Sequence, residues 1–131
     1  MTHSFLRVLS YLINWMPRKV RVALGSSLGW FWFHVVRFRR QVVIDNIRLA
    51  YGAEKTPDQV HALAAENFRQ YGLLIIEYLQ SITWKSADYY KNVPFDGIEN
   101  LKSALAEGNG VYVLSLHIGN WEWAMGILVA H

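Results

Sequence analysis

The longest regular pattern of apolar positions lies in the middle of the chain, after residue 56. The spacing of these residues, three or four positions apart, predicts one helix with a continuous apolar stripe. Thr56-Pro57-Asp58-Gln59 precedes the stripe and has the form of a capping box with proline at the first helical position. We therefore expect a helix that runs to about Ser81, with a stripe that belongs to the core and carries no chemistry. The stripe consists of Val60, Leu63, Ala64, Phe68, Tyr71, Leu74, Ile75 and Tyr78.

Two apolar segments precede this helix. Residues 5–17 are interrupted by Arg7 and end at Pro17, whereas residues 22–36 contain no charged side chain. A helix of fifteen residues spans about 22 Å, less than the roughly 30 Å of a hydrocarbon core. The aromatic run at residues 30–33, WFWF, is typical of a membrane interface. These patterns favour helices that span a membrane or lie flat on it, over the alternative of two core helices of a soluble domain.

The last third of the chain predicts a different arrangement. Residues 83–94 are expected to be a connector, and Glu99–Glu107 a short helix that ends at Gly108. The short apolar run at residues 111–116, VYVLSL, follows a turn and has the profile of a strand buried on both faces. An apolar helix is expected at residues 123–130. The order helix, turn, strand, loop, helix is that of an α/β unit, although most of the chain is predicted to be helical.

Composition and charge narrow the class of protein. The chain has 131 residues, of which 53% are hydrophobic and 18% charged, and a net charge of +3. This composition excludes a disordered or coiled-coil chain, and the absence of cysteine excludes a disulfide scaffold and a thiolate zinc site. Basic residues crowd the first 55 positions, which predicts an anionic phospholipid surface as partner. Nucleic acid is not expected, because the aromatic residues sit inside an apolar run instead of alternating with basic ones.

The candidate chemistry lies at the end of the predicted strand. His117 would leave the carboxyl end of that strand, where α/β sheets open onto ligand crevices, and Asn120 is placed to cap the next helix. Glu122 would occupy the first turn of that helix, within reach of His117. An imidazole oriented by a carboxylate can take a proton from a substrate hydroxyl. The alternatives are a core histidine bonded to backbone and an acid that complements the helix dipole. The scattered histidines predict no metal site.

Residues 117–122, HIGNWE, resemble the H-x4-E block of the bacterial lipid A biosynthesis acyltransferases, the late lauroyl and myristoyl transferases of the lysophospholipid acyltransferase superfamily. Residues 95–111 and 39–51 are similar to two further stretches of that family. The glutamate at position 122, where glycerol-phosphate acyltransferases have aspartate, favours the lipid A branch.

The resemblance implies transfer of an acyl chain from acyl carrier protein to a hydroxyl of a lipid A precursor, at the cytoplasmic face of the bacterial inner membrane. It implies His117 as general base and Glu122 as its orienting partner, with Arg39, Arg40 and Asn120 as substrate-binding residues. No metal or cofactor is expected beyond the acyl carrier protein that serves as co-substrate. Two alternatives stay open: an acyltransferase of the superfamily that acts on another lysophospholipid or glycolipid, and a non-catalytic membrane-binding module.

The domain organisation follows from these parts. Residues 1–55 are predicted to be a basic, apolar, membrane-associating helical region, and residues 56–131 the N-terminal part of an α/β acyltransferase domain. Members of the family are longer than this chain, and a parallel strand at 111–116 needs neighbours for its backbone groups. We therefore expect the chain to be an N-terminal fragment of the enzyme or a truncated gene product.

Overall fold

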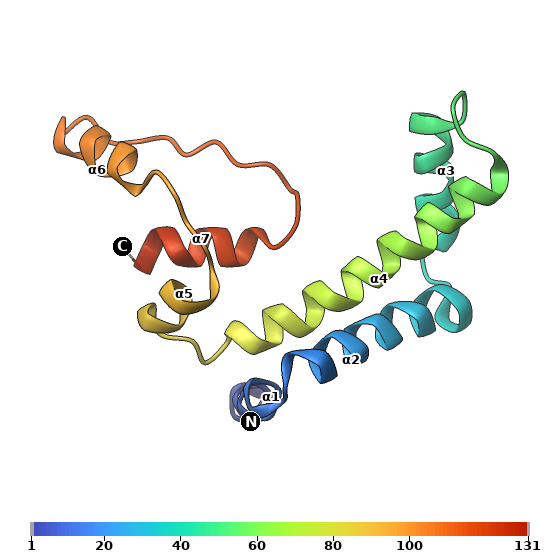
Figure 1. Ribbon diagram of the computed structural model, residues 1–131, viewed down its shortest axis with the longest axis horizontal. Coiled ribbons are helices and arrows are strands. Elements are labelled where there is room, and N and C mark those ends of the chain that lie inside the picture. The colour runs from blue at the N-terminus through green and yellow to red at the C-terminus, as the bar shows by residue number, and fades with distance from the viewer. Residues whose placement is uncertain (1, 131) are drawn as a thin grey trace.

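The computed structural model describes residues 2–130, and it describes their side chains from residue 4 onward. The described chain is mostly helical and contains no β-strand (Figure 1). Its elements, in order, are α1 (Thr2–Trp15), α2 (Arg18–Phe31), the π-helix η1 (Trp32–Val36), α3 (Arg40–Tyr51), α4 (Pro57–Ser81), α5 (Ser86–Asn92), α6 (Ile98–Ala106) and α7 (Trp121–Ala130). The prediction of a predominantly helical chain is confirmed.

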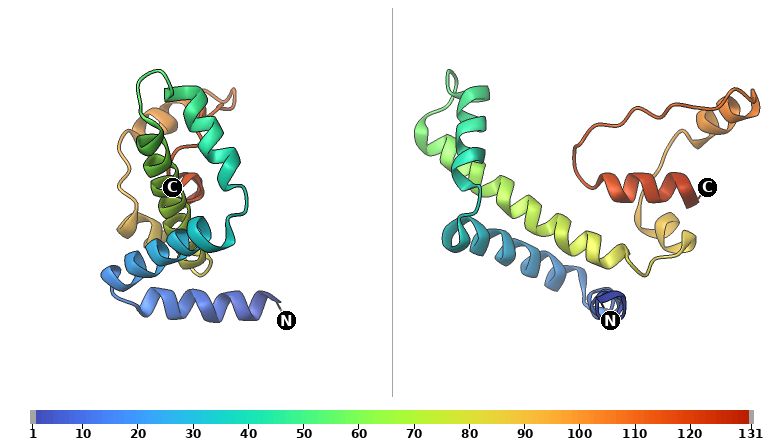
Figure 2. Two further views of the ribbon diagram at one scale, coloured as in Figure 1. Left: turned by 90° about the vertical axis from the view of Figure 1, so that its right-hand side faces the viewer. Right: turned by 180° about the vertical axis from the view of Figure 1, so that it is seen from behind.

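Helix α4 organises the fold. It runs antiparallel to α2, and the two helices lie side by side over most of the length of α2 (Figures 1 and 2). Helix α3 packs on the N-terminal half of α4, and α7 lies beside its C-terminal half. Helix α4 is therefore the element through which the N-terminal helices and the H-x4-E block are connected.

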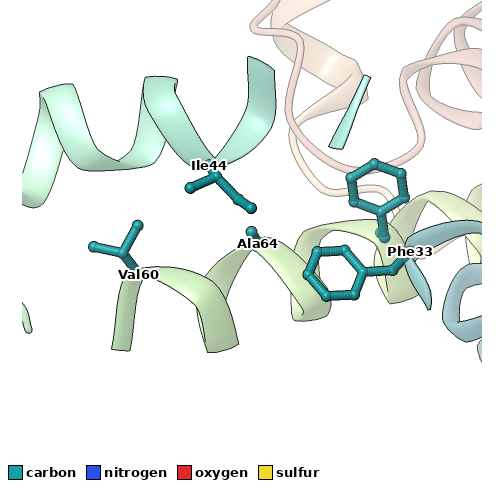
Figure 3. Packing of buried hydrophobic residues seen from close by; sticks show 5 residues of the cluster. Phe33, Ile44, Val60 and Ala64 are labelled. Carbon is teal, nitrogen blue, oxygen red and sulfur yellow. The ribbon is translucent and has the colours of Figure 1, made fainter. Parts of the chain in front are cut away.

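The main hydrophobic core joins three of these elements. It consists of Phe33 from η1, Ile44 from α3, and Val60, Ala64 and Phe68 from α4 (Figure 3). The ring of Phe33 meets that of Phe68 edge-on, with centroids 5.4 Å apart. Residues from both sides of the predicted boundary at position 55 thus share one core.

The start and length of α4 match the prediction. The Thr56 side chain accepts a hydrogen bond from the backbone N–H of Gln59 at 3.3 Å, and the Gln59 side chain accepts one from the Thr56 N–H at 2.9 Å. This reciprocal capping box satisfies two N–H groups that the first turn would otherwise leave unpaired. The helix ends at Ser81, as expected.

The buried face of α4 differs from the predicted stripe. Val60, Ala64 and Phe68 are buried, but Leu63, Tyr71 and Tyr78 are exposed. The buried line continues at a spacing of four residues, through Gly72, Ile76 and Gln80. The reason is that the close crossing of α2 covers Gly72, so the covered face follows the partner helix and not the largest apolar side chains.

A polar cluster attaches α1 to the C-terminal end of α4. The Ser10 hydroxyl and the Asn14 amide both donate to the carbonyl oxygen of Gln80, at 3.0 and 2.8 Å. The indole N–H of Trp84 donates to the Asn14 side-chain oxygen at 3.1 Å. These bonds satisfy a carbonyl near the end of α4 that has no partner within the helix.

The opposite face of α1 is apolar and exposed. Phe5, Val8, Leu12 and Trp15 recur along it at helical spacing, and Trp15 is 87% exposed. Across residues 2–130, none of the helices combines the length and the apolar character that crossing a membrane requires.

The predicted apolar segment 22–36 forms two elements instead of one. Helix α2 ends at Phe31, and the π-helix η1 closes with a hydrogen bond from the Arg37 N–H to the Trp32 carbonyl at 2.8 Å. Arg37 and Arg39 then adopt the left-handed conformation, with φ angles of 58° and 59°. This corner turns the chain into α3.

Two predictions for the last third of the chain are wrong. The expected connector at 83–94 contains α5, and the ring of Tyr89 in α5 lies against Gly126 of α7. Residues 111–116 are not a buried strand, because no other described segment pairs with their backbone. Tyr112 is 100% and Leu114 98% exposed. The α/β unit is therefore not formed within the described residues, whereas the two flanking helices are present as α6 and α7.

Candidate functional site

A groove of about 670 Å³ lies between α4 and the loop that leads into α7. We call it the His117 groove. The loop side and the start of α7 contribute His117, Gly119, Asn120, Trp121 and Glu122. The α4 side is formed by exposed and half-buried residues that include Asn67, Gln70, Tyr71, Leu74, Glu77 and Tyr78. The second half of the predicted core stripe thus lines a groove, contrary to the expectation that it only fills the core.

Local backbone geometry places His117 at the edge of this groove. A tight turn, in which the Ile118 N–H donates to the Leu116 carbonyl at 2.8 Å, redirects the chain after the extended segment. Gly119 follows with a φ of 65°, a conformation that favours glycine. The His117 side chain is exposed, and its ring centroid lies 5.2 Å from that of Trp121. The ring is therefore open to a substrate that enters the groove.

Asn120 caps α7, as the sequence predicts. Its side-chain oxygen accepts a hydrogen bond from the backbone N–H of Trp123 at 3.0 Å. Its amide nitrogen donates to a carboxylate oxygen of Glu77 in α4, also at 3.0 Å. Asn120 thus connects the loop after His117 to both adjoining helices.

Glu122 lies in the first turn of α7, is half-buried, and lines the same groove as His117. Within the described part of the chain, no hydrogen bond or ion pair joins His117 to Glu122. The structure brings the two side chains to one groove without placing them in direct contact. Catalytic hydrogen bonds are often long without substrate and tighten in the complex, so this geometry leaves the dyad a prediction.

Glu77 is the residue that sequence reasoning missed. Besides accepting from Asn120, its backbone carbonyl accepts a hydrogen bond from the Trp123 indole N–H at 3.2 Å. The sequence does contain a signal, because Glu77 is the single charged residue between Arg69 and Lys85. A lone acid in an apolar stretch of helix indicates a polar partner from elsewhere in the fold.

Arg39 and Arg40 do not line the His117 groove. The Arg40 guanidinium lies 5.4 Å from the ring centroid of Phe33, and that of Arg39 lies 5.8 Å from the ring of Phe38. Arg39 is the N-cap of α3 and Arg40 its first residue, and α3 packs on the N-terminal half of α4. If Arg39 and Arg40 bind substrate, as the sequence predicts, they do so outside the His117 groove.

Two other basic residues lie closer to the groove. Arg18 and Arg21 of α2 line a cavity of about 500 Å³ together with Glu77 and Trp123. Arg21 is half-buried, and its guanidinium donates to the Met16 carbonyl at 2.6 Å. Leu73 and Glu77 of α4 line both this cavity and the His117 groove. The positive charges of Arg18 and Arg21 therefore lie next to the groove, on the side of α2.

No metal centre is found among the described side chains of residues 4–130, where no three His, Asp or Glu side chains converge. The chemistry available in the His117 groove is that of an accessible imidazole, a nearby carboxylate and an amide held between two helices.

Comparisons with known proteins address the family. A model of the bacterial lipid A biosynthesis acyltransferases matches residues 2–131. The chain is 25% identical over 107 residues to the lipid A biosynthesis palmitoleoyltransferase of Escherichia coli (strain K12) and to a lipid A biosynthesis acyltransferase of Shigella flexneri. Each match covers 82% of this chain and 35% of the relative, so the chain spans about a third of the length of these relatives. No solved structure matches it. The chain belongs to the bacterial lipid A biosynthesis acyltransferase family.

Proposed function

We propose that the protein containing this chain moves a fatty acyl group from acyl carrier protein to a hydroxyl of a lipid A precursor. The observation that carries the proposal is that His117 and Glu122 line one open groove on α4. Family membership supports acyl transfer as the reaction class. The donor, the acceptor and the roles of the two residues are parts of the proposal.

The proposed reaction uses His117 as a general base. Its free ring nitrogen takes the proton of the acceptor hydroxyl while the hydroxyl oxygen attacks the carbonyl carbon of the acyl thioester. The carbon–sulfur bond breaks, and the imidazolium gives its proton to the leaving thiolate. Glu122 bonds the other ring nitrogen in the substrate complex, which fixes the tautomer and stabilises the imidazolium. Every atom of this step comes from the two substrates and the imidazole, so no cofactor is needed.

We further propose that the N-terminal helices hold the protein on the cytoplasmic face of the inner membrane. The exposed face of α1 presents Phe5, Val8, Leu12 and Trp15, and basic residues follow the helix at positions 18, 19 and 21. An apolar helical face beside basic residues binds an anionic bilayer by burying its side chains among the acyl chains. Arg39 and Arg40 then meet headgroup or sugar phosphates outside the groove. Acyl carrier protein approaches from the cytoplasm.

The test replaces His117 by glutamine in the protein as its gene encodes it. Transfer from acyl carrier protein to a lipid A precursor should fall by about a hundredfold or more, because a positioned base contributes about 10²–10⁴-fold. His34→Gln is the matched control, since His34 is also exposed but lies on η1, outside the His117 groove. Full activity of His117→Gln would reject His117 as the base.

Lipid analysis identifies the acceptor. Deleting the gene should leave lipid A short of one acyl chain, as read by mass spectrometry. A missing acyl chain on another lysophospholipid or glycolipid would reject the lipid A acceptor. Membrane binding without any transfer would reject the enzyme assignment in favour of a binding module.

A further inference from the structure

We propose that Glu77 of α4 is a positioning residue that sets the location of His117 through Asn120. The inference rests on the proposed function of His117 and concerns how that side chain is held. The sequence predicts that α4 contributes only to the hydrophobic core, whereas this inference gives α4 a second role in positioning His117.

The hydrogen bonds around Asn120 leave its amide one orientation. The oxygen faces the N–H of Trp123 at 3.0 Å, and the NH₂ group faces the Glu77 carboxylate at 3.0 Å. Turning the amide over would set donor against donor and oxygen against carboxylate. Glu77 therefore fixes the orientation of the Asn120 side chain, which caps α7.

His117 depends on this attachment because the chain before it has no comparable one. Residues 111–116 pair with no other described segment, and Leu116 and Ile118 are exposed. After His117, the first residue with a hydrogen bond to another helix is Asn120, three positions away, whose side chain donates to Glu77 of α4. Gly119 lies between them with a φ of 65°, which other residues rarely adopt.

Glu77 is well suited to hold the Asn120 side chain in place. Glu77 is half-buried in an otherwise uncharged stretch of α4, where a carboxylate without a partner would be costly. A hydrogen bond to an ionised acceptor is stronger than one between neutral groups. Moreover, the bond from the Trp123 indole goes to the backbone carbonyl of Glu77, so it survives a change of the Glu77 side chain. Substitutions can therefore loosen the Asn120 contact while α7 stays docked.

Exchanging the amide of Asn120 and the carboxylate of Glu77 between the two positions tests the proposal. Asn120→Asp keeps the cap on α7, since aspartate is as good an N-cap as asparagine, but it sets a carboxylate against Glu77. Adding Glu77→Gln to Asn120→Asp restores one donor and one acceptor with the direction of the bond reversed. Glu66→Gln is the matched control, because it makes the same change on α4 outside the His117 groove.

We expect Asn120→Asp to lower kcat at least tenfold with little change in KM, and the double variant to regain activity to within about threefold of the original protein. In the chain of residues 1–131, the backbone amide resonances of residues 117–119 should shift in Asn120→Asp and return in the double variant. Glu66→Gln should change neither quantity. A fully active Asn120→Asp, or a folded double variant that stays as slow as Asn120→Asp, would overturn the proposal.

The two readouts separate this inference from the proposed reaction. If His117→Gln leaves transfer intact, His117 is not the base, yet the amide resonances still report whether Glu77 holds the loop. If the resonances do not return in the double variant, Glu77 does not position the loop, whatever the result for His117.

Discussion

Gly72 of α4 lies so close to Gly29 of α2 that a β-carbon on Gly72 would come within 2.6 Å of the Gly29 backbone nitrogen. Real β-carbons do not approach backbone atoms this closely, so the two helices meet backbone to backbone. Gly25 and Gly29 are one helical turn apart on α2, and both are buried in this contact. The absence of side chains at these three glycines allows α2 and α4 to approach this closely.

Gly72→Ala should therefore destabilise the protein by about 1–3 kcal/mol or more, because the added methyl group forces the two backbones apart. Denaturant unfolding of the chain measures the loss. Ser27→Ala, on an exposed position of α2, is the control and should change stability by no more than about 0.5 kcal/mol. An equally stable Gly72→Ala would contradict the close crossing.

Phe33→Ala should cost about 3–5 kcal/mol, because Phe33 is completely buried and fills the centre of the core shared by η1, α3 and α4. Phe38→Ala removes the same side chain from an exposed position and should cost far less. The comparison is made from the unfolding free energies of the two variants. Equal losses would show that the core does not depend on Phe33.

Asn14→Ala should loosen α1 from the end of α4. The substitution removes the acceptor of the Trp84 indole and one of two donors to the Gln80 carbonyl. Leaving such groups unpaired costs about 1–3 kcal/mol. Hydrogen exchange of the α1 amides should become faster than in Leu12→Ala, which changes an exposed position of the same helix. Unchanged exchange in Asn14→Ala would show that α1 is held by its apolar contacts alone.

The pair Glu66–Arg69 predicts a small pH dependence of stability. Hydrogen bonds from Arg69, aided by one from Gln70, lower the pKa of Glu66 from 4.5 to about 2. Because this pKa is lower in the folded state, the stabilisation is complete above the unfolded value and is lost as the pH falls from about 4.5 to about 2.

Both side chains of this pair are well exposed, so solvent screening limits the effect to about 1 kcal/mol or less. Unfolding measured between pH 5 and pH 2, for the original chain and for Glu66→Gln, checks this prediction. The difference in stability between the two should shrink toward zero at the acid end. A difference that stays constant with pH would exclude the ion pair as its cause.

Replacing Phe5, Leu12 and Trp15 together by serine should reduce binding to anionic phospholipid vesicles. Each of these side chains lies on the exposed face of α1, where it can enter the bilayer interface. Vesicle flotation measures the bound fraction. The control replaces Tyr112 and Leu114, which are at least as exposed but belong to the extended segment. Equal loss in both variants would show general apolar adhesion and not an α1-specific surface.

The features that the sequence predicted correctly are local ones. The capping box of Thr56 and Gln59 and the Asn120 cap depend on residues three positions apart, so their geometry follows from the helix itself. Features that depend on distant partners were missed. The buried face of α4 passes through Gly72 because α2 crosses α4 at that position. The contact of Glu77 was missed because its partner, Asn120, lies 43 positions further along the sequence.

The predicted strand shows the same dependence. Residues 111–116 have the apolar, β-branched composition of a buried strand, but a strand exists only where another segment receives its backbone hydrogen bonds. The described residues supply none, so the segment is extended and exposed. Composition led to the prediction of a strand, but it could not show that no partner for that strand lies among the described residues.

This unpaired segment also separates the site mechanically from what precedes it. Helix α6 packs extensively on no other described helix, and it reaches His117 only through an extended stretch without backbone pairing. We thus expect a displacement of α6 to be taken up along residues 107–116 before it reaches the His117 groove. Strain applied on the α4 side, in contrast, is expected to reach the loop through the hydrogen bond between Glu77 and Asn120. We therefore expect the His117 loop to move together with α4 and α7, because Asn120 hydrogen-bonds to Glu77 and caps α7, and we expect α6 to move independently of them.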